Sequence, residues 1–275
     1  MRSSTAQQGL SPPNFFWVFS ESGPIDCLPS NLNVLVSAGV AWENSSADKF
    51  GTVWTPRSPD NVFIDSGGYQ AVSRWGGEYP YSPTELFEYA SQMGAEYVAT
   101  MDLVCDPNVE SDLSSTERIE QTVENTTEVV AAYEASSTNY DFQLVPVIQG
   151  WKPREYLECV DAFRDRGLIR EYMGIGSVAR KHANDEIHEI LTRLNNNLPS
   201  TDFHLFGAKL SIVRDHRFWG QFESCDSAAW RFRPSELGRD KMYAESKHEK
   251  TKFFYTYKQK INHAKSQMQA QTTLF

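Results

Sequence analysis

Cysteine is scarce in this sequence, and no two cysteines stand at short spacing. The four cysteines lie far apart in the 275 residues, and no CxxC or CxC motif is present. Cysteine-based zinc sites and disulfide frameworks both need closely spaced cysteines, so we expect neither. The sequence thus predicts no metal site and no cofactor, and its scattered thiols favour a reduced, cytoplasmic protein.

Long apolar runs and two common sequence signals are also missing. No stretch reaches the ~18 apolar residues of a membrane-spanning helix, so we expect no membrane partner. Residues 1–14, MRSSTAQQGLSPPN, lack the apolar core of a signal peptide and are expected to form a flexible lead-in. The GxGxxG fingerprint of dinucleotide-binding sheets is absent, which counts against that fold.

The two signs of charge are unevenly distributed along the chain. The whole sequence has 36 acidic and 26 basic residues, but from Arg231 onward ten are basic and four are acidic. An acidic body with a basic C-terminal segment is typical of a nucleic-acid contact, although a solvated basic helix has the same composition. The side chains that we expect to contact nucleic acid are Arg231, Arg233, Lys247, Lys250, Lys252 and Lys258.

Short apolar runs alternate with helical patterns along the rest of the sequence. One predicted helix starts at a capping-box pair, Ser82 and Glu85, another starts at Pro153, and a basic one covers 245–268. Continuous apolar runs are typical of strands that are buried on both faces. The predicted strands are 15–20, 33–39, 61–65, 97–102, 143–149, 171–177, 203–209 and 221–226.

This order of elements predicts the fold class. About eight strands with intervening helices indicate an α/β protein with a (β/α)8 TIM-like barrel, and a doubly wound open sheet is the alternative. We expect the barrel to span residues 15–240. A basic helical extension at 241–275 is expected to pack on or beside the barrel, without a zinc subdomain.

Polar side chains stand where several of the predicted strands end. In a barrel of this type, the C-terminal ends of the strands build the active site. A buried carboxylate costs roughly several kcal/mol unless it is paired or solvated, so the fold itself does not require several of them. The alternative for each acid is a structural role as the N-cap of the next helix. These strand-end residues are Asp65, Asp102, Gln149, Ser177 and Asp226.

Glycosyl transfer is a chemistry that uses carboxylates and no metal. A retaining reaction needs one carboxylate as nucleophile and a second group for proton transfer, and it passes through a covalent intermediate. A flat leaving group suits Tyr69 as a stacking face, and Asp102 suits an amidine-like N–H edge such as that of guanine. Glycines in QG at 149–150 and in GIGS at 174–177 allow a ligand to approach the backbone.

Six segments between about residues 60 and 230 together match the ordered motifs of a known enzyme family. They are DSGGYQ at 65–70, MDLVCDP at 101–107, VIQG at 147–150, YMGIGSVA at 172–179, HLFGAK at 204–209 and FESCDSAAW at 222–230. DSGGYQ is similar to the hallmark motif of the tRNA-guanine transglycosylases, which exchange bases in queuosine and archaeosine biosynthesis, and the other five resemble that family's segments in the same order.

The resemblance implies a role for each matching residue. Asp226 would attack C1′ of the nucleoside, Asp65 would act as general base, and Asp102 would hold the N1/N2 edge of the base. Tyr69 and Phe206 would enclose the ring. The segment SCDSAAW departs from the family's usual pattern, which leaves Asp215 and Glu223 as rival nucleophiles. The remaining residues expected to bind the substrate are Ser66, Gly67, Gln149, Gly150, Gly176 and Ser177.

One motif of the tRNA enzymes is missing from this sequence, and its absence favours one branch of the family. The tRNA enzymes carry a CxC…C…H zinc site near the C-terminus, and Cys225 is the last cysteine here. The chain therefore most resembles the DpdA-like branch, which replaces guanine in DNA by a 7-deazaguanine such as preQ0. This implies DNA as partner, with accessory DNA-modification proteins as further ones. A tRNA-directed enzyme, a catalytically silent nucleic-acid-binding barrel and a glycoside hydrolase are the alternatives.

The basic segment contains aromatic residues whose role stays open at this point. Phe253, Phe254, Tyr255 and Tyr257 are interleaved with lysines. On the DNA interpretation the lysines contact phosphates, and the aromatic rings either stack on bases or dock the helix on the barrel.

Overall fold

The nine described strands form one parallel sheet that nearly closes on itself. This computed structural model describes residues 13–21, 23–25, 27–45, 48–179, 181, 183–232 and 246–272. The strand order is β5-β4-β3-β2-β1-β9-β8-β7-β6, and every pair is parallel. The strands are β1 (Asn14–Phe19), β2 (Asn33–Ser37), β3 (Asn61–Asp65), β4 (Tyr97–Ala99), β5 (Gln143–Val145), β6 (Val147–Ile148), β7 (Tyr172–Ile175), β8 (Asp202–Leu205) and β9 (Ser224–Ser227).

The two ends of the sheet meet at Pro146. β5 and β6 are the two halves of the strand predicted at 143–149, and β5 pairs with β4 while β6 pairs with β7. Proline has no N–H to donate, so the ladder is interrupted there, but the Pro146 carbonyl still accepts from the Gly174 N–H at 2.8 Å. The sheet therefore has eight strand positions around a nearly closed barrel, which confirms the predicted fold class.

Alternate side chains along each strand pack on opposite faces of the barrel wall. One core fills the interior and contains Phe16, Leu35, Phe63, Ala99, Val145 and Val147. The other core lies between the strands and the helices, where Trp17, Val34 and Ile64 are buried. Burial on both faces explains why the strands read as continuous apolar runs in the sequence.

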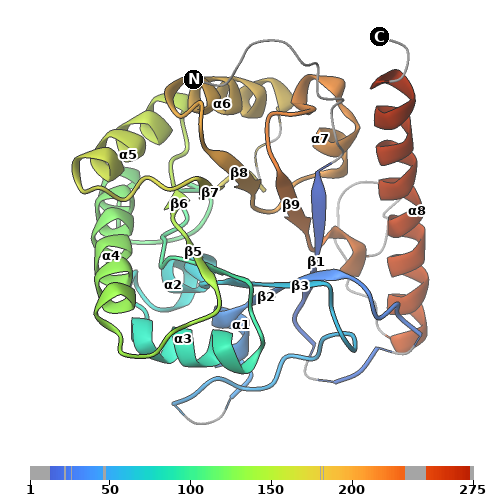
Figure 1. Cartoon of the computed structure of the whole chain (residues 1–275), viewed down its shortest axis with the longest axis horizontal. Helices are drawn as coiled ribbons and strands as arrows, with labels where there is room; N and C mark the ends of the chain where they lie inside the picture. Colours follow the sequence, from blue (N-terminus) through green and yellow to red (C-terminus); the bar gives the residue numbers. More distant parts are fainter. Residues whose placement is uncertain are drawn as a thin grey trace.

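Helices surround the barrel as an outer ring, and Figure 1 shows the strands at its centre. The helix predicted from Ser82 and Glu85 has its capping box, in which the Ser82 side chain accepts from the Glu85 N–H. The helices are α1 (Ala38–Glu43), α2 (Gly68–Arg74), α3 (Pro83–Gln92), α4 (Ser115–Ala135), α5 (Pro153–Asp165), α6 (Asn184–Asn197), α7 (Leu210–Arg214) and α8 (Lys247–Thr272). Among these described helices none is long and apolar enough to cross a membrane.

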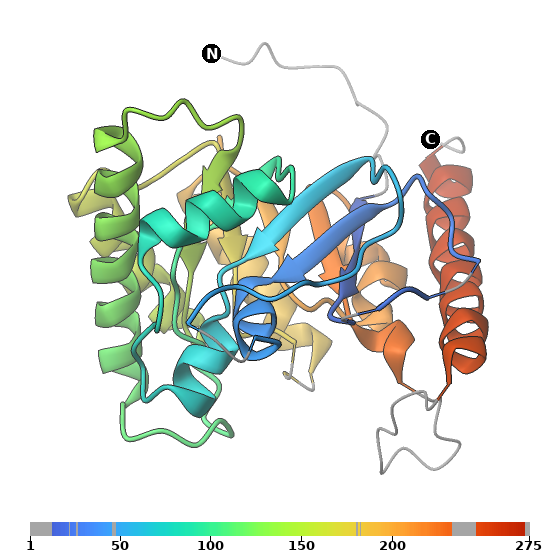
Figure 2. The same ribbon diagram turned by 90° about the horizontal axis from the view of Figure 1, so that it is seen from below.

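The C-terminal helix α8 docks against the first strand. Figure 2 shows α8 at one side of the barrel, beyond β1 and β2. Phe254 is fully buried, and its ring centroid lies 4.4 Å from that of Trp17 in β1. Tyr257 is also buried, whereas Tyr255 is 41% exposed. Phe254 and Tyr257 therefore dock the helix. The boundary predicted at 240–241, most of the lead-in at 1–14 and Arg233 lie outside the described residues.

Replacing Phe254 by alanine should lower the free energy of unfolding by about 3–4 kcal/mol, because it leaves a cavity between Trp17 and Trp230. Urea denaturation followed by tryptophan fluorescence measures this. The control is Phe253→Ala, at a half-buried neighbouring position, which should cost clearly less. Equal costs for the two variants would show that α8 does not pack through Phe254.

Candidate active site

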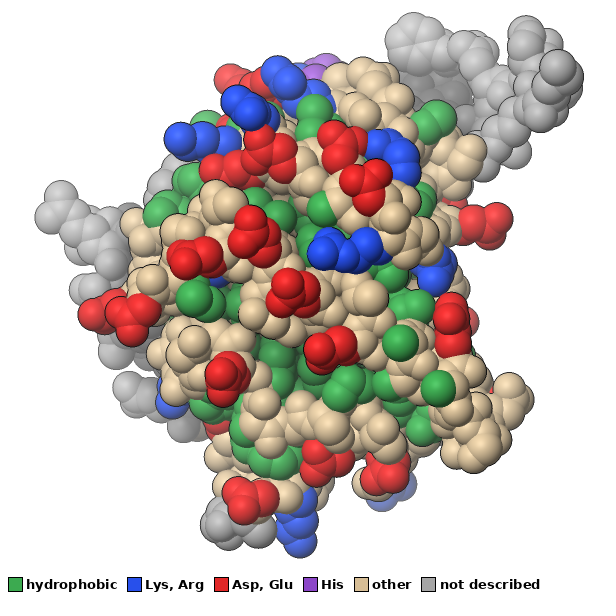
Figure 3. Space-filling model, turned by 90° about the vertical axis from the view of Figure 1, so that its left-hand side faces the viewer, with side chains coloured by type: hydrophobic (Ala, Val, Ile, Leu, Met, Phe, Trp, Pro, Cys, Tyr) green, Lys and Arg blue, Asp and Glu red, His purple; other side chains and the backbone are tan. Residues whose placement is uncertain are grey.

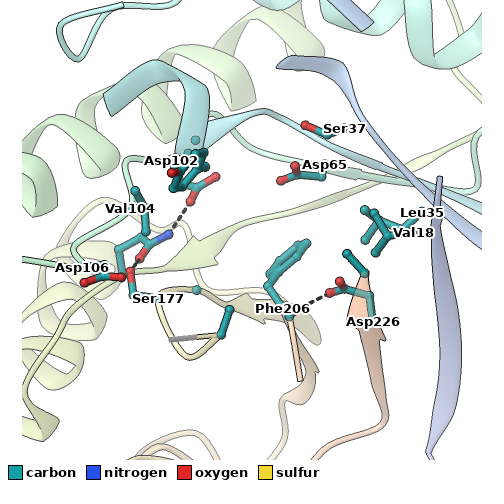
Figure 4. A pocket seen from close by; sticks show the side chains of 17 residues that line it. Val18, Leu35, Ser37, Asp65, Asp102, Val104, Asp106, Ser177, Phe206 and Asp226 are labelled. Atoms are coloured by element: carbon teal, nitrogen blue, oxygen red, sulfur yellow. Dashed lines mark hydrogen bonds between the residues drawn. The ribbon is translucent and has the colours of Figure 1, made fainter. Parts of the chain in front are cut away.

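A cavity of about 270 Å³ opens at the C-terminal ends of the strands. Three acids line it, namely Asp65 in β3, Asp226 in β9 and Asp102 in the loop after β4, and Figure 4 shows their side chains around one space. Five further predicted residues line the same cavity, namely Tyr69, Gln149, Gly176, Ser177 and Phe206. Folding thus brings together residues that are separated by up to 161 positions in the sequence.

The three acids are not helix caps. Asp65 is the last residue of β3, and the N-cap of the following helix α2 is Gly67, which makes no side-chain cap bond. Asp102 lies three residues beyond the end of β4, and Asp226 lies within β9. The N-cap alternative is therefore wrong for Asp65, and the described helices give none of the three carboxyl groups a capping role.

Both oxygens of Asp102 are held by neighbouring side chains. The Ser66 hydroxyl donates to Oδ1 at 2.9 Å, and the Gln149 side-chain amide donates to Oδ2. Gln149 is held in turn, because the Ser177 hydroxyl donates to its Oε1 at 2.6 Å and accepts from the Cys105 N–H at 2.8 Å. This chain of hydrogen bonds crosses from β3 to the loop after β7 and fixes the orientation of one wall of the cavity.

Ser66, Gly67 and Gly150 lie beside the cavity and are not among its lining residues. Ser66 supports Asp102 from behind, as described above. Gly67 has φ 94°, and a Cβ there would come within 2.7 Å of the backbone of Gly39. A Cβ on Gly150 would come within 2.8 Å of the Tyr156 nitrogen. These glycines are required for close packing of the loops that carry the site.

The glycine in β7 and the glycine just after its end make room for protein side chains. A Cβ on Gly174 would lie 2.5 Å from the Phe206 ring, and one on Gly176 would lie 2.1 Å from the Gln149 amide nitrogen. The sequence argument assigned GIGS to ligand approach. The structure adds that these glycines let Phe206 and Gln149 reach into the cavity.

Burial changes the proton affinity of two of the acids. Burial, together with the negative charges of Asp102 and Asp226, raises the pKa of Asp65 to about 7. Burial also raises the pKa of Asp102 to about 6, and hydrogen bonds from Gln149 and Ser66 limit that increase. Near neutral pH, Asp102 is therefore mainly ionised, while Asp65 exchanges readily between its neutral and charged forms. A group with that behaviour suits proton transfer.

Asp226 is held by two donors. Its Oδ1 accepts from the Gly207 N–H at 2.8 Å and lies 3.2 Å from Nε2 of His204. The rival nucleophiles lie elsewhere. Asp215 caps the turn at His216–Phe218 and binds Arg217, which lowers its pKa to about 2. Glu223 lines a different cavity, which opens at the N-terminal ends of the strands.

Several lining residues are absent from the sequence-based set. Asp106, Val18, Leu35, Val104 and Gly207 line the cavity. Val18 and Leu35 could have been predicted from the two-residue repeat of a strand, because inward positions of a barrel alternate with outward ones. No group of three or more His, Cys, Asp or Glu side chains in the described part of the chain is arranged to hold a metal ion.

One family model matches most of the sequence. Its description is DpdA, DeoxyPurine in DNA protein A, and it covers residues 37–273. The chain belongs to the DpdA family. The match includes all three acids of the cavity and the helix α8, which are therefore parts of the DpdA unit. No curated protein matches the chain significantly.

Three of the basic residues predicted to contact nucleic acid in this DpdA-family chain lie around one hollow. Arg231, Lys247 and Lys250 line this third cavity, of about 360 Å³, next to the residues that follow β1. Buried Glu21 lies 3.2 Å from the Arg231 Nε and 3.4 Å from the Lys250 Nζ. Lys252 is exposed and Lys258 is half-buried on α8.

Asp65→Asn should change how stability depends on pH. In the folded protein Asp65 keeps its proton up to about pH 7, whereas in the unfolded chain it loses it near pH 4. A raised carboxyl pKa stabilises the folded state at low pH, and this contribution is lost as the pH rises through about 7. The free energy of unfolding of wild type should therefore fall relative to the variant, by about 1–3 kcal/mol between pH 5 and pH 8.

Urea denaturation at a series of pH values measures this difference. Asp112→Asn, which changes an exposed carboxylate, is the control and should show no comparable trend. A difference between wild type and Asp65→Asn that stays constant with pH would contradict the raised pKa.

Proposed function

We propose that this chain is a DNA transglycosylase that replaces guanine in DNA by a 7-deazaguanine base such as preQ0. The observation that carries the proposal is the meeting of Asp65, Asp102 and Asp226 around one cavity in a chain of the DpdA family. The description of that family names deoxypurine in DNA. A barrel with acids at its C-terminal strand ends supplies the groups that base exchange needs.

In the first step, Asp226 attacks C1′ of the target deoxyguanosine. The bond between C1′ and N9 breaks as the bond from C1′ to a carboxylate oxygen forms, and the electron pair leaves with guanine. The neutral form of Asp65 donates the proton that the leaving base requires. A pKa of about 7 keeps that form populated at neutral pH.

In the second step, the incoming base displaces Asp226. The Asp65 carboxylate, left ionised by the first step, removes a proton from the incoming base. The base then attacks C1′, and Asp226 leaves as a carboxylate. Two displacements retain the configuration at C1′, and no proton is gained or lost over the cycle.

Base recognition in this proposal uses the opposite wall of the cavity. The ionised Asp102 accepts from the N1–H and the exocyclic amine of a guanine-like edge, and Gln149 has an amide for a further polar atom of the base. Tyr69, which is 44% exposed at the cavity mouth, and Phe206 supply aromatic faces for the ring.

The charge distribution indicates from which side DNA approaches. Helix α8 carries six lysines and one acid, and its first turn adjoins the residues that follow β1 and β9. Helix α4 lies on the opposite side of the barrel and exposes five glutamates (Figure 1). Figure 3 shows acidic side chains scattered over that face. DNA phosphates are attracted to the α8 side and repelled by the α4 side.

A base must leave the helical stack before it enters this cavity. Extrusion from a duplex costs about a few kcal/mol, and phosphate contacts on the α8 side offset part of that cost. Accessory DNA-modification proteins and a cytoplasmic location remain predictions from the sequence.

Asp226→Asn should reduce base exchange by about 10³-fold or more, because the amide is a poor nucleophile. The measurement is incorporation of radiolabelled guanine or preQ0 into DNA. Asp215→Asn and Glu223→Gln are the matched controls, since both acids lie away from the cavity, and both variants should keep near wild-type activity.

The same assay with tRNA in place of DNA decides which nucleic acid is the substrate. Incorporation into tRNA alone would overturn DNA as the substrate. Full activity of Asp226→Asn would overturn its role as nucleophile, and DNA binding by wild type without any exchange would indicate a silent barrel.

Replacing Lys247 and Lys252 by alanine together should weaken DNA binding and flatten its salt dependence. Each lost phosphate contact lowers the slope of log K against log salt by about 1, so the double variant should lose up to about 2. Fluorescence anisotropy with an oligonucleotide at several salt concentrations measures the slope. Glu120→Ala and Glu124→Ala on α4 serve as controls, and an unchanged slope in the lysine variant would exclude these contacts.

A further inference from the structure

A buried histidine lies directly behind Asp226. His204 in β8 is fully buried in the barrel interior, and the two nitrogens of its ring both have polar partners. Its ring packs against Phe63 and Phe206, with centroids 4.6 Å and 4.5 Å away. The sequence alone favours a core histidine at this position. The structure shows a core histidine that contacts the carboxyl group at the centre of the proposed reaction.

His204 belongs to a chain of hydrogen bonds that runs along the barrel interior. The Tyr172 hydroxyl lies 2.5 Å from the Ser224 hydroxyl, and Ser224 lies 2.6 Å from Nδ1 of His204. Nε2 of His204 lies 3.2 Å from Oδ1 of Asp226. Tyr172 and Ser224 line the polar cavity at the N-terminal ends of the strands, so the chain connects that cavity to the candidate active site.

The chemistry of the four groups sets the direction of these hydrogen bonds. A carboxylate only accepts, so Nε2 of His204 carries the hydrogen that points at Asp226. In a neutral imidazole Nδ1 then accepts, and the Ser224 hydroxyl donates to it. The oxygen of Ser224 is left to accept from Tyr172. Every hydrogen-bond donor in this series, from Tyr172 to His204, therefore points toward Asp226.

The two oxygens of the Asp226 carboxyl group therefore differ in their hydrogen bonds. Oδ1 of Asp226 receives the His204 Nε2–H and the Gly207 N–H. Within the described residues Oδ2 has no hydrogen-bond partner, and Asp226 itself lines the cavity. We propose that His204 is a positioning residue that presents Oδ2 as the nucleophilic oxygen and stabilises the carboxylate charge on Oδ1. This inference rests on the proposed function.

The arrangement has a consequence for the two steps of base exchange. Hydrogen bonds to a carboxylate are stronger than hydrogen bonds to the carbonyl oxygen of an ester. The His204 and Gly207 donors therefore favour the free carboxylate of Asp226 over its ester with C1′. When the incoming base attacks C1′, the bond to Oδ2 breaks, its electron pair returns to Asp226, and the two donors stabilise the departing carboxylate. Loss of His204 should slow this second step and raise the level of the covalent intermediate.

Two substitutions at this position separate positioning from packing. His204→Phe keeps an aromatic ring among Phe16, Phe63 and Phe206 but removes the donor. His204→Gln keeps an N–H donor at similar reach. Ser224→Ala removes the partner of Nδ1 and leaves the ring in place. Tyr97→Phe is the matched control, because Tyr97 lines the same polar cavity and packs on Tyr172 without being part of the chain.

The kinetic test combines steady-state exchange with trapping of the covalent protein–DNA adduct on denaturing gels. For His204→Phe we expect kcat to fall about 10–100-fold, the loss that corresponds to one hydrogen bond to a charged group, with KM for the base little changed. The trapped adduct should increase. His204→Gln should recover most of the rate, Ser224→Ala should lose less than His204→Phe, and Tyr97→Phe should match wild type. An unchanged kcat in His204→Phe, or less adduct than wild type, would overturn the proposal.

A spectroscopic test keeps this inference separate from the proposed function. In protein labelled with ¹⁵N-histidine, the His204 signal is identified by its loss in His204→Gln. We expect the neutral Nε2–H tautomer in wild type and a changed Nδ1 shift in Ser224→Ala. An Nδ1–H tautomer would overturn the inference even if exchange occurs. Absence of exchange in wild type would overturn the proposed function, while the tautomer would still report on the contact with Asp226.

Discussion

The mutual repulsion of three carboxyl groups around one cavity is the constraint on which the rest of the site depends. Burial is the main cause of the raised pKa of Asp65, and the charges of Asp102 and Asp226 raise it further. Asp102 keeps a lower pKa because Ser66 and Gln149 donate to it, and Asp226 has donors from Gly207 and His204. Of Asp65 and Asp102, Asp65 has the higher pKa and is the one that takes up a proton near neutral pH, which is the property that a proton-transfer group needs.

The barrel meets this constraint with donors supplied by neighbouring strands. Asp102 is held by Ser66 just after β3 and by Gln149 just after β6, while Asp226 in β9 is held from β8 and the residues that follow it. Because adjacent parallel strands keep a constant register, a donor on one strand stays opposite the same acceptor on the next. Gly174 in β7 and Gly176 just after it complete the arrangement, since any side chain at either position would displace Phe206 or Gln149.

The ends of the strands were harder to predict than their presence. Continuous apolar runs located all eight strand positions, because each strand is buried on both faces. The run at 97–102 was expected to be one strand, but β4 ends at Ala99, and the Val147 N–H donates to the Thr100 hydroxyl instead of to a backbone carbonyl of that run. The run at 143–149 is divided at Pro146, which cannot donate to the ladder. In both cases the strand ends because of a side-chain hydrogen bond or a missing N–H donor, and hydrophobic periodicity does not reveal either of them.

The sequence by itself determined the order of strands and helices, the acids near the strand ends and the basic character of α8, because periodicity, composition and short motifs are local properties. The tertiary structure alone decided which polar groups meet. Glu21 lies beside Arg231 across 210 positions, and His204 reaches Asp226 only because β8 and β9 pair in one register. A shift of one residue would turn His204 to the other face of the barrel wall, and the hydrophobic pattern of strands that are buried on both faces does not by itself specify that register.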